Sequence, residues 1–246
     1  GTPSGAFVEV VRANGRRTVR GTTLNVGGPV PLTVGKDAGY AYSSIQAAID
    51  AASPGGLVTV APGLYEEAPI LWKRVRVQGY GAPVSIINAA MGAEYIRQAA
   101  WRQKACDLVF DQNMADALVP GQTVPANKTA CLTGDTADNA PLLFASEEAS
   151  GFFVLQRAIT AQNNNQAFAV ANLPKLSIDG FTITGADTGG GIVANGNAVQ
   201  LEIANNRITG NQGLYNGGIR IGHADLIVGQ ADTDAAVVEP LVAGDP

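Results

Sequence analysis

The chain has 246 residues, enough for one large all-β domain or for a smaller domain with an additional segment. Charged residues make up only 15% of it, while 30 residues are glycine and 13 are proline, a composition typical of short strands joined by tight turns. The formal net charge is −5 and the basic residues are scattered, so we expect neither nucleic acid nor anionic membrane as a partner. No apolar run reaches membrane-spanning length, and we expect the chain to be part of a larger polypeptide or assembly.

Residues 1–35 alternate apolar and polar side chains from Phe7 to Val34, with Asn14-Gly15 as a turn signal between two predicted strands. The pattern predicts a β-hairpin, which is too small to bury a core alone. This hairpin resembles the closing hairpin of the immunoglobulin-like TIG modules of large bacterial surface proteins. The resemblance implies that residues 1–35 end a preceding domain of that kind.

A helix is predicted over Ser43–Ala52. Ser43 and Gln46 have the spacing of a capping box, in which each side chain satisfies a backbone N–H at the start of the helix. Pro54-Gly55-Gly56 ends the pattern. Apolar side chains recur along one face of this helix, at Ile45, Ala48, Ile49 and Ala52. We expect that face to cover one end of a β structure.

Short β-rich segments separated by glycine follow the helix and return near the end of the chain. Three of them are too short for helices: Leu57–Val60, Val75–Val77 and Val84–Ile87. Residues 176–185 and 201–210 share Leu, Ile, Ile, Thr and Gly at matching places, 25 positions apart. Gly190-Gly191-Ile192 matches Gly217-Gly218-Ile219 at an offset of 27. Such a repeat indicates a coiled β-solenoid, in which each turn buries its aliphatic side chains by stacking on its neighbours.

Residues 89–165 interrupt the repeat and are predicted to form a structured side insertion. Within them, Glu94–Lys104 favours a helix and Gly151–Thr160 favours a strand. Cys106 and Cys131 also lie here, and two interpretations are open: a disulfide or two buried thiols. We favour the disulfide, which would stabilise the fold by about 3 kcal/mol in the loop-entropy model and implies an oxidising compartment.

Several features occur together in this sequence: Ser44–Ala52, Val58–Glu67, Val77–Gly81 and the 25-residue repeat. Together they resemble the pectin-lyase-like superfamily, over about half of the chain. The resemblance implies an all-β fold, namely a right-handed parallel β-helix (solenoid) with an amino-terminal capping helix and a long side insertion. The predicted division places the capping helix and first turns at 36–88, the insertion at 89–165, and further turns with a carboxy-terminal tail at 166–246.

Lyase members of that superfamily are similar in using an Arg or Lys base beside a group of acids that holds Ca²⁺ against the substrate. Here no acid group has metal-ligand spacing and there is one histidine, so we predict no metal site and no cofactor, with Ca²⁺ required only if the chain is a lyase. Glu66 and Glu67 are an adjacent carboxylate pair that we expect to be structural. Catalytic residues stay unassigned. Four residues are ligand-binding candidates, with an ordinary surface role as the alternative for each: Asp187, Arg207, Arg220 and His223.

A clear repeat architecture without a catalytic constellation favours a non-catalytic module over an enzyme. We predict a scaffold for adhesion, polysaccharide contact or self-assembly within a secreted or cell-surface bacterial protein, with the periplasm as an alternative location. The competing hypothesis is a fragment of a polysaccharide lyase or glycoside hydrolase that acts on acidic polysaccharide.

Overall fold

The computed structural model describes residues 4–7, 11, 13–15, 23–26, 28–90, 95–111, 149–156, 173–187, 189–195, 198, 200–213 and 217–221. These residues contain fifteen strands and two helices. Thirteen of the strands form three parallel sheets, and the other two pair as an antiparallel hairpin. The described part of the chain is therefore predominantly β, as the composition predicts.

The three parallel sheets follow one common order of strands. The first sheet contains β3 (Leu32–Val34), β4 (Leu57–Val60), β7 (Arg76–Gly79), β10 (Leu176–Asp179) and β13 (Leu201–Ala204), side by side in that order. The second contains β5 (Gly63–Tyr65), β8 (Ser85–Asn88), β11 (Thr182–Thr184) and β14 (Arg207–Ile208). The third contains β6 (Ile70–Leu71), β9 (Phe152–Leu155), β12 (Ile192–Asn195) and β15 (Ile219–Ile221).

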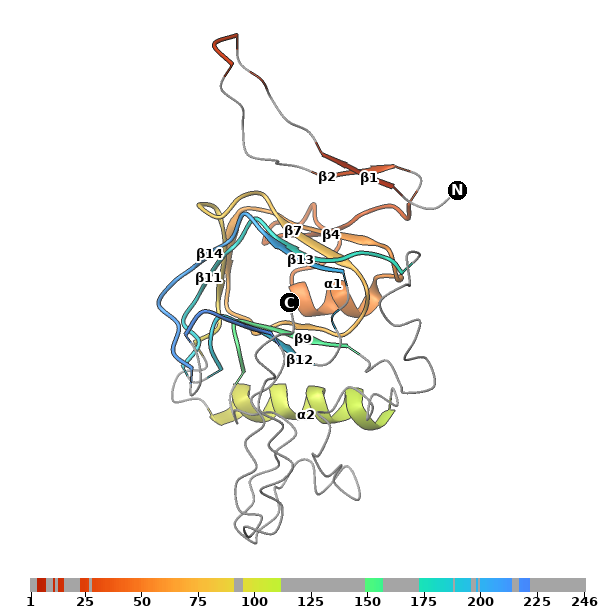
Figure 1. Cartoon of the computed structure of the whole chain (residues 1–246). Helices are drawn as coiled ribbons and strands as arrows, with labels where there is room; N and C mark the ends of the chain where they lie inside the picture. Colours follow the sequence, from red (N-terminus) through yellow and green to blue (C-terminus); the bar gives the residue numbers. More distant parts are fainter. Residues whose placement is uncertain are drawn as a thin grey trace, which may run out of the picture.

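From β4 onward, every three consecutive strands contribute one strand to each sheet. We call these sets triplets 1 to 4: β4–β6, β7–β9, β10–β12 and β13–β15. Figure 1 shows the three sheets facing a common interior. This arrangement is compatible with a parallel β-helix.

The strand register confirms both offsets found in the sequence. Leu176 of β10 pairs with Leu201 of β13, and Ile192 of β12 pairs with Ile219 of β15. Leu176 is fully buried, whereas Leu201 is half-buried against the same core. The repeated aliphatic positions therefore stack on one another, as the repeat predicts.

One hydrophobic core lies between the three sheets. Its fully buried members include side chains from every sheet, among them Val58, Val77, Ile178, Ile183 and Phe152. Because these strands are short, each contributes only one or two inward side chains, and the core forms by stacking between triplets.

Helix α1 (Ile45–Ala51) packs on this core and supports the predicted apolar face. All four predicted face positions are buried: Ile45, Ala48, Ile49 and Ala52. The helix contacts β3, β4 and β6, and it lies inside the outline of the sheets in Figure 1. It thus fills space beside the first strands of the described fold.

The predicted capping box at Ser43 and Gln46 is wrong. The N-cap is Ser44, whose backbone is extended and whose hydroxyl accepts a hydrogen bond from the Ala47 N–H at 3.3 Å. A carboxylate from outside the helix, Glu67, satisfies the next two backbone N–H groups. It accepts hydrogen bonds from the Ile45 and Gln46 N–H groups, both at 3.1 Å. The Gln46 side chain therefore does not cap the helix, and it forms its hydrogen bonds elsewhere.

Asparagines join triplet 4 to triplet 3 at the bends between strands. Asn205 has φ +55°, the left-handed conformation that asparagine tolerates. The neighbouring Asn206 accepts from the Phe181 N–H at 2.9 Å and donates to the Ile178 carbonyl at 2.8 Å. Asn211 likewise bonds backbone groups of triplet 3. These side chains satisfy polar backbone groups where the strand pairing is interrupted.

The predicted amino-terminal hairpin is present as β1 (Ser4–Phe7) paired antiparallel with β2 (Thr23–Val26). A turn at 13–15 contains Gly15 with φ +77°, consistent with the Asn14-Gly15 signal. The range predicted for the hairpin also contains β3, which instead pairs parallel with β4. Leu32–Val34 therefore belongs to the first parallel sheet.

Helix α2 (Tyr95–Asp111) covers the third sheet from outside. Its Trp101 packs in a second buried cluster with Ile70 and Phe153, and the rings of Trp101 and Phe153 meet edge to face with centroids 5.5 Å apart. Both α2 and β9 were predicted within the 89–165 insertion, and β9 pairs with β6 and β12. Cys106 is buried on α2, but Cys131 lies outside the described residues, so their disulfide stays a prediction.

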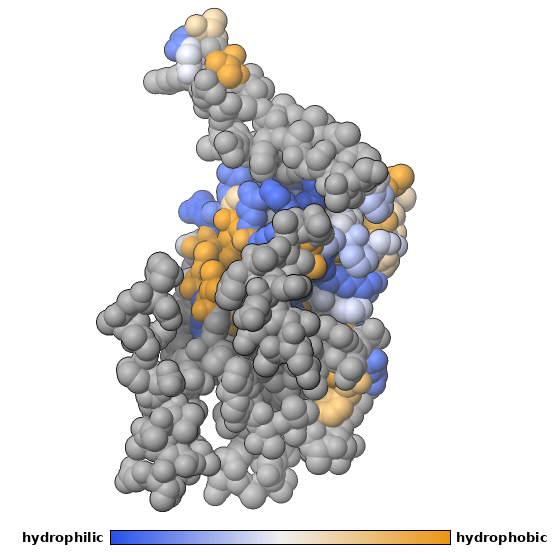
Figure 2. Space-filling view, turned by 45° about the vertical axis from the view of Figure 1, so that its right-hand side comes forward, coloured by the Kyte–Doolittle hydropathy of each residue, from blue (hydrophilic) through white to orange (hydrophobic). Residues whose placement is uncertain are grey.

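The described surface carries apolar side chains beside polar ones. Figure 2 shows apolar groups next to hydrophilic groups on the face that it presents. Among exposed hydrophobic residues, Val30 is 87%, Ile221 71% and Tyr80 61% exposed. Ile221 belongs to triplet 4, whose strand residues are more exposed than those of triplet 3.

Candidate functional site

A pocket of about 250 Å³ lies between α1, the connection from β5 to β6, the end of β8 and α2. We call it the α1–α2 pocket. Its walls are formed by Gln46, by residues 66–68 and 70, by residues 88–90, and by residues 100, 101 and 104. The pocket thus combines segments from triplets 1 and 2 with a helix from the predicted insertion.

Small side chains leave the space that forms this pocket. Its apolar wall contains four alanines, at positions 68, 89, 90 and 100, together with Ile70 and Trp101. Trp101 is only 6% exposed, because most of its ring packs against the third sheet. A larger residue at an alanine position on this wall would project into the pocket.

Glu67 lies between the pocket and the amino end of α1, and its carboxylate is already occupied. Besides the two backbone N–H groups of α1, it accepts a hydrogen bond from the Ser44 hydroxyl at 2.9 Å. A negative charge at this end of a helix is favourable, because the unpaired N–H groups there carry partial positive charge. Glu67 is therefore a structural residue, as predicted, whereas Glu66 is exposed, makes no bond within the described residues and does not share that role.

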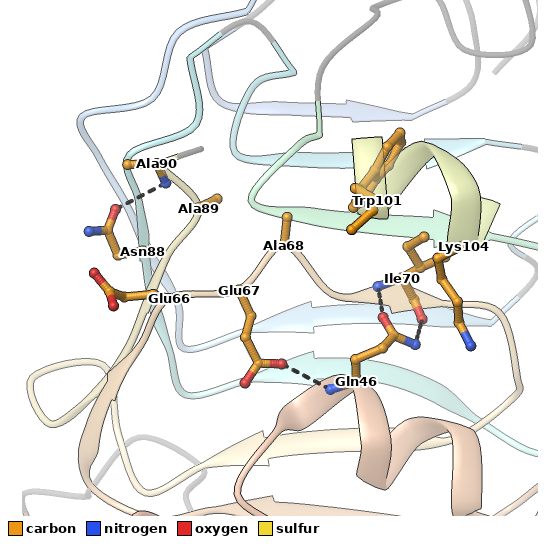
Figure 3. Close-up of a pocket in the computed structure, with 11 residues that line it drawn as sticks. Gln46, Glu66, Glu67, Ala68, Ile70, Asn88, Ala89, Ala90, Trp101 and Lys104 are labelled. Atoms are coloured by element: carbon orange, nitrogen blue, oxygen red, sulfur yellow. Dashed lines mark hydrogen bonds between the residues drawn. The ribbon is translucent and has the colours of Figure 1, made fainter. Parts of the chain in front are cut away.

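Gln46 is also occupied by the fold. Its side-chain amide both accepts from the Ile70 N–H at 2.7 Å and donates to the Ile70 carbonyl at 3.2 Å. Figure 3 shows these two bonds, which tie α1 to β6 along the lower wall of the pocket. This contact replaces strand pairing for the backbone of Ile70 on that side.

Lys104 of α2 contributes a positive charge that is paired with Asp50 of α1. The Nζ atom lies 2.7 Å from the Asp50 carboxylate, and both side chains are about one third exposed. The same Asp50 accepts a hydrogen bond from the indole N–H of Trp72 at 2.7 Å. This ion pair connects the two helices, and its charges offset one another beside the pocket.

Glu66 and Asn88 lie at the end of the pocket beside the second sheet, and Figure 3 shows their polar groups pointing away from the apolar wall. Tyr65 and Ile87 are in register on β5 and β8, so the residues that follow them, Glu66 and Asn88, lie next to each other. Within the described part of the chain, Glu66 is exposed and makes no hydrogen bond or ion pair. Asn88 uses its carbonyl oxygen to accept from the Ala90 N–H at 3.2 Å, and its NH₂ group makes no hydrogen bond to another described residue.

The predicted ligand-binding residues that the structure describes lie away from this pocket and on different parts of the fold. Arg207 is exposed on β14 in the second sheet, and Arg220 is half-buried on β15 in the third. Asp187 is exposed after β11, while His223 lies outside the described residues. Their roles as ligand-binding residues stay predictions. No group of three or more His, Cys, Asp or Glu side chains within the described ranges could hold a metal ion.

A buried carboxylate on the first sheet has a different role from the pocket carboxylates. Asp179 is 9% exposed and accepts a hydrogen bond from the Asn205 side chain at 2.8 Å. Burial raises the pKa of Asp179, the hydrogen bond from Asn205 lowers it, and the nearby charge of Glu202 raises it further. The net effect is a raised pKa, so ionisation of Asp179 works against the stability of the fold.

No pattern in the sequence marks Asn88, Trp101 or Lys104 as residues of a common site. Comparison with protein-family models and with curated proteins gives no match for this chain. Neither helix within the described ranges is long and apolar enough to cross a membrane. The α1–α2 pocket is therefore a candidate functional site because of its geometry alone.

Proposed function

We propose that the chain is a right-handed parallel β-helix of the pectin-lyase-like kind. It would serve as a non-catalytic scaffold in a secreted or cell-surface bacterial protein and contact polysaccharide or other copies of itself. The observation that carries this proposal is the common strand order of the three parallel sheets, with repeated residues such as Leu176 and Leu201 in register. A stack of this kind presents rigid, extended outer faces, which suits a scaffold.

The roles of the two adjacent glutamates support a non-catalytic scaffold. Glu67 is held in three hydrogen bonds at the start of α1, and Glu66 stands beside Asn88 without a second carboxylate available to it there. A pair of carboxylates that hydrolyses a sugar bond needs both groups at the substrate. Here Glu67 stabilises the fold and Glu66 faces solvent, so the two carboxylates do not act together.

The outer face of the second sheet is the surface that we assign to polysaccharide contact. Four outward positions follow one another in register across β5, β8, β11 and β14: Leu64, Ile86, Thr182 and Arg207. We call them the second-sheet row. Leu64 is 51% exposed and Arg207 is exposed, so the row begins apolar and ends cationic. Neighbouring strands lie about 4.8 Å apart, which matches the scale of single sugar units along an extended chain.

Affinity electrophoresis through gels containing neutral and acidic polysaccharides tests this contact. We expect retarded migration in at least one gel, weakened by Arg207→Ala. Lys175→Ala is the matched control, because Lys175 is also an exposed cation but lies by the first sheet in a weak pair with Glu202 at 4.0 Å. Unaltered migration in every gel, combined with a strictly monomeric protein in analytical ultracentrifugation, would contradict the scaffold proposal.

The enzyme hypothesis is tested by incubating the protein with polyuronates, with and without Ca²⁺, and following the absorbance of unsaturated products. We expect no turnover. Turnover that is abolished by Arg207→Ala or Arg220→Ala would instead establish a polysaccharide lyase and overturn the non-catalytic proposal. Release of reducing ends without unsaturated products would point to a glycoside hydrolase.

A further inference from the structure

We propose that the outer face of the second sheet binds a neutral, extended polysaccharide along two parallel rows of side chains. One is the second-sheet row. The other lies beside it and consists of hydrogen-bonding side chains, and we call it the polar row: Glu66, Asn88, Thr184 and Thr209. This inference rests on the polysaccharide contact proposed above, and it names the class of polysaccharide and the groups that recognise it.

The strand register sets the polar row. Four side chains that pack in or against the core occupy in-register positions across β5, β8, β11 and β14: Tyr65, Ile87, Ile183 and Ile208. Because successive side chains of a strand face opposite sides of the sheet, the residue after each of them points outward. Figure 3 shows Glu66 and Asn88 next to each other, with their polar groups directed away from the wall of the α1–α2 pocket.

The outer faces of the other two sheets are less accessible. On the first sheet, three outward side chains of β7 and β10 are at most 9% exposed: Gln78, Ser177 and Asp179. On the third sheet, the outward Phe153 is buried against Trp101 of α2. On the second sheet, by contrast, Leu64 is 51% exposed, and Glu66 and Thr209 are also exposed. A long ligand can therefore reach this face.

The polar row offers hydrogen-bonding groups that the fold does not use. Four groups make no hydrogen bond to another described residue: the Glu66 carboxylate, the Asn88 NH₂ group and the hydroxyls of Thr184 and Thr209. The second-sheet row differs, since the hydroxyl of Thr182 donates to the Ala82 carbonyl. Sugar hydroxyls both donate and accept, so they can pair with a carboxylate, an amide NH₂ group or a threonine hydroxyl.

The two rows together match the two kinds of surface on a sugar ring. Leu64 and Ile86 of the second-sheet row can contact the apolar C–H groups of a ring, while the polar row binds the hydroxyls at its edge. Neighbouring strands lie about 4.8 Å apart, so the four strands extend over about 14 Å, the scale of a few consecutive sugar units. Straight rows of this kind favour an extended chain over a coiled one.

The charges of the two rows disfavour an acidic polysaccharide. Glu66 follows β5 and Arg207 lies on β14, which are the first and last strands of the sheet. A polyuronate carries a carboxylate on every sugar, so Arg207 would pair with one of them while Glu66 repels another. A neutral chain can donate to Glu66 and accept from Arg207, which leaves no ligand charge unpaired.

Affinity electrophoresis that compares hydroxyethyl cellulose with polygalacturonate tests the inference, with a gel that lacks polysaccharide as the reference. We expect hydroxyethyl cellulose to retard the protein more strongly. Thr184→Val combined with Thr209→Val removes two hydroxyls, keeps β-branched side chains and should weaken this binding about tenfold. Thr33→Val combined with Thr59→Val is the matched control, because these threonines are also in register on adjacent strands but belong to the first sheet. Circular dichroism checks that both variants retain the fold.

Glu66→Lys tests the charge preference. Replacing the negative charge by a positive one should strengthen binding to polygalacturonate about fivefold, as expected for a gained pair of exposed charges. If polygalacturonate binds the variant and the unaltered protein equally, Glu66 does not face the ligand and the assigned preference is wrong.

This inference and the polysaccharide contact can fail separately. If polygalacturonate alone retards the protein, or if the Thr184 and Thr209 variant binds hydroxyethyl cellulose like the unaltered protein, the inference is wrong and the contact stands. If that variant binds more weakly while Arg207→Ala does not, the polar row stands and the role assigned to Arg207 is wrong. If no polysaccharide retards the protein, the contact is wrong and the inference fails with it.

Discussion

Replacing Glu67 by alanine should destabilise the protein markedly, although the residue is not part of the hydrophobic core. Its carboxylate accepts three hydrogen bonds at the start of α1, two of them from backbone N–H groups that have no partner within the helix. Loss of a capping side chain costs about 1 kcal/mol, and loss of the favourable charge at the helix end adds about 0.3–1 kcal/mol. Because Ser44 also loses its partner, we expect a total of about 2 kcal/mol.

Urea denaturation followed by circular dichroism measures this change in the free energy of unfolding. Glu66→Ala is the matched control, because it removes the neighbouring carboxylate, which is exposed and has no bond within the described residues; its effect should stay within about 0.5 kcal/mol. Glu67→Gln keeps one acceptor oxygen without the charge and should fall between the two. If Glu66→Ala and Glu67→Ala destabilise the protein equally, the capping role assigned to Glu67 is wrong.

Three further substitutions test the core, a bend and a buried carboxylate by the same denaturation measurement. Asn206→Ala should cost about 1–3 kcal/mol, because the Phe181 N–H and the Ile178 carbonyl lose their partner; no change would refute the role of the asparagine. Ile178→Ala, at a fully buried position, should cost about 2–5 kcal/mol, whereas Ile221→Ala, at a 71% exposed position, should cost far less. Asp179→Asn should stabilise the protein at pH 7. Since burial raises the pKa of Asp179 in the folded state, the stability of the unaltered protein falls as pH rises through that pKa, and the gain from Asn should vanish below the ordinary aspartate range; an equal gain at pH 3 would refute this account.

The parallel strands could be predicted because each repeat carries its own pattern of inward aliphatic residues. Leu176 and Leu201 occupy equivalent places in two segments of the sequence, and stacking of equivalent strands brings them into register. The glycines and Asn205 mark the bends between those strands, where a left-handed backbone is required. Information of this kind is local and repeated, so a single sequence is enough to reveal it.

The N-cap of α1 was predicted wrongly because the contact that determines it is not encoded in the local sequence. Ser43 and Ser44 are both suitable N-cap residues, and Gln46 has the correct spacing from the first of them. The choice between the two serines is made by Glu67, which is distant in sequence and accepts hydrogen bonds from the Ser44 hydroxyl and the Ile45 and Gln46 N–H groups. A tertiary contact therefore decides which serine caps the start of the helix.

The α1–α2 pocket could not be predicted for a related reason. Its wall comes from four separate segments, and four of its lining residues are alanines, whose side chains carry no chemical signal in the sequence. Trp101 and Lys104 belong to a helix whose place outside the third sheet is not encoded in the repeat. The predicted candidates were instead charged residues within the repeats, and Arg207 and Arg220 lie on different sheets.

The contrast between Glu66 and Glu67 explains why the repeat reveals so much of the fold and so little of the site. Successive side chains beyond β5 point in different directions, so one glutamate reaches the helix and the other faces solvent beside Asn88. Burial and hydrogen bonding constrain Glu67, and substitution there changes stability. Few contacts constrain Glu66, so natural selection can alter it without cost to the core. In a stacked β structure of this kind, residues that carry binding are therefore expected at positions that the fold leaves free, where the repeat gives no signal.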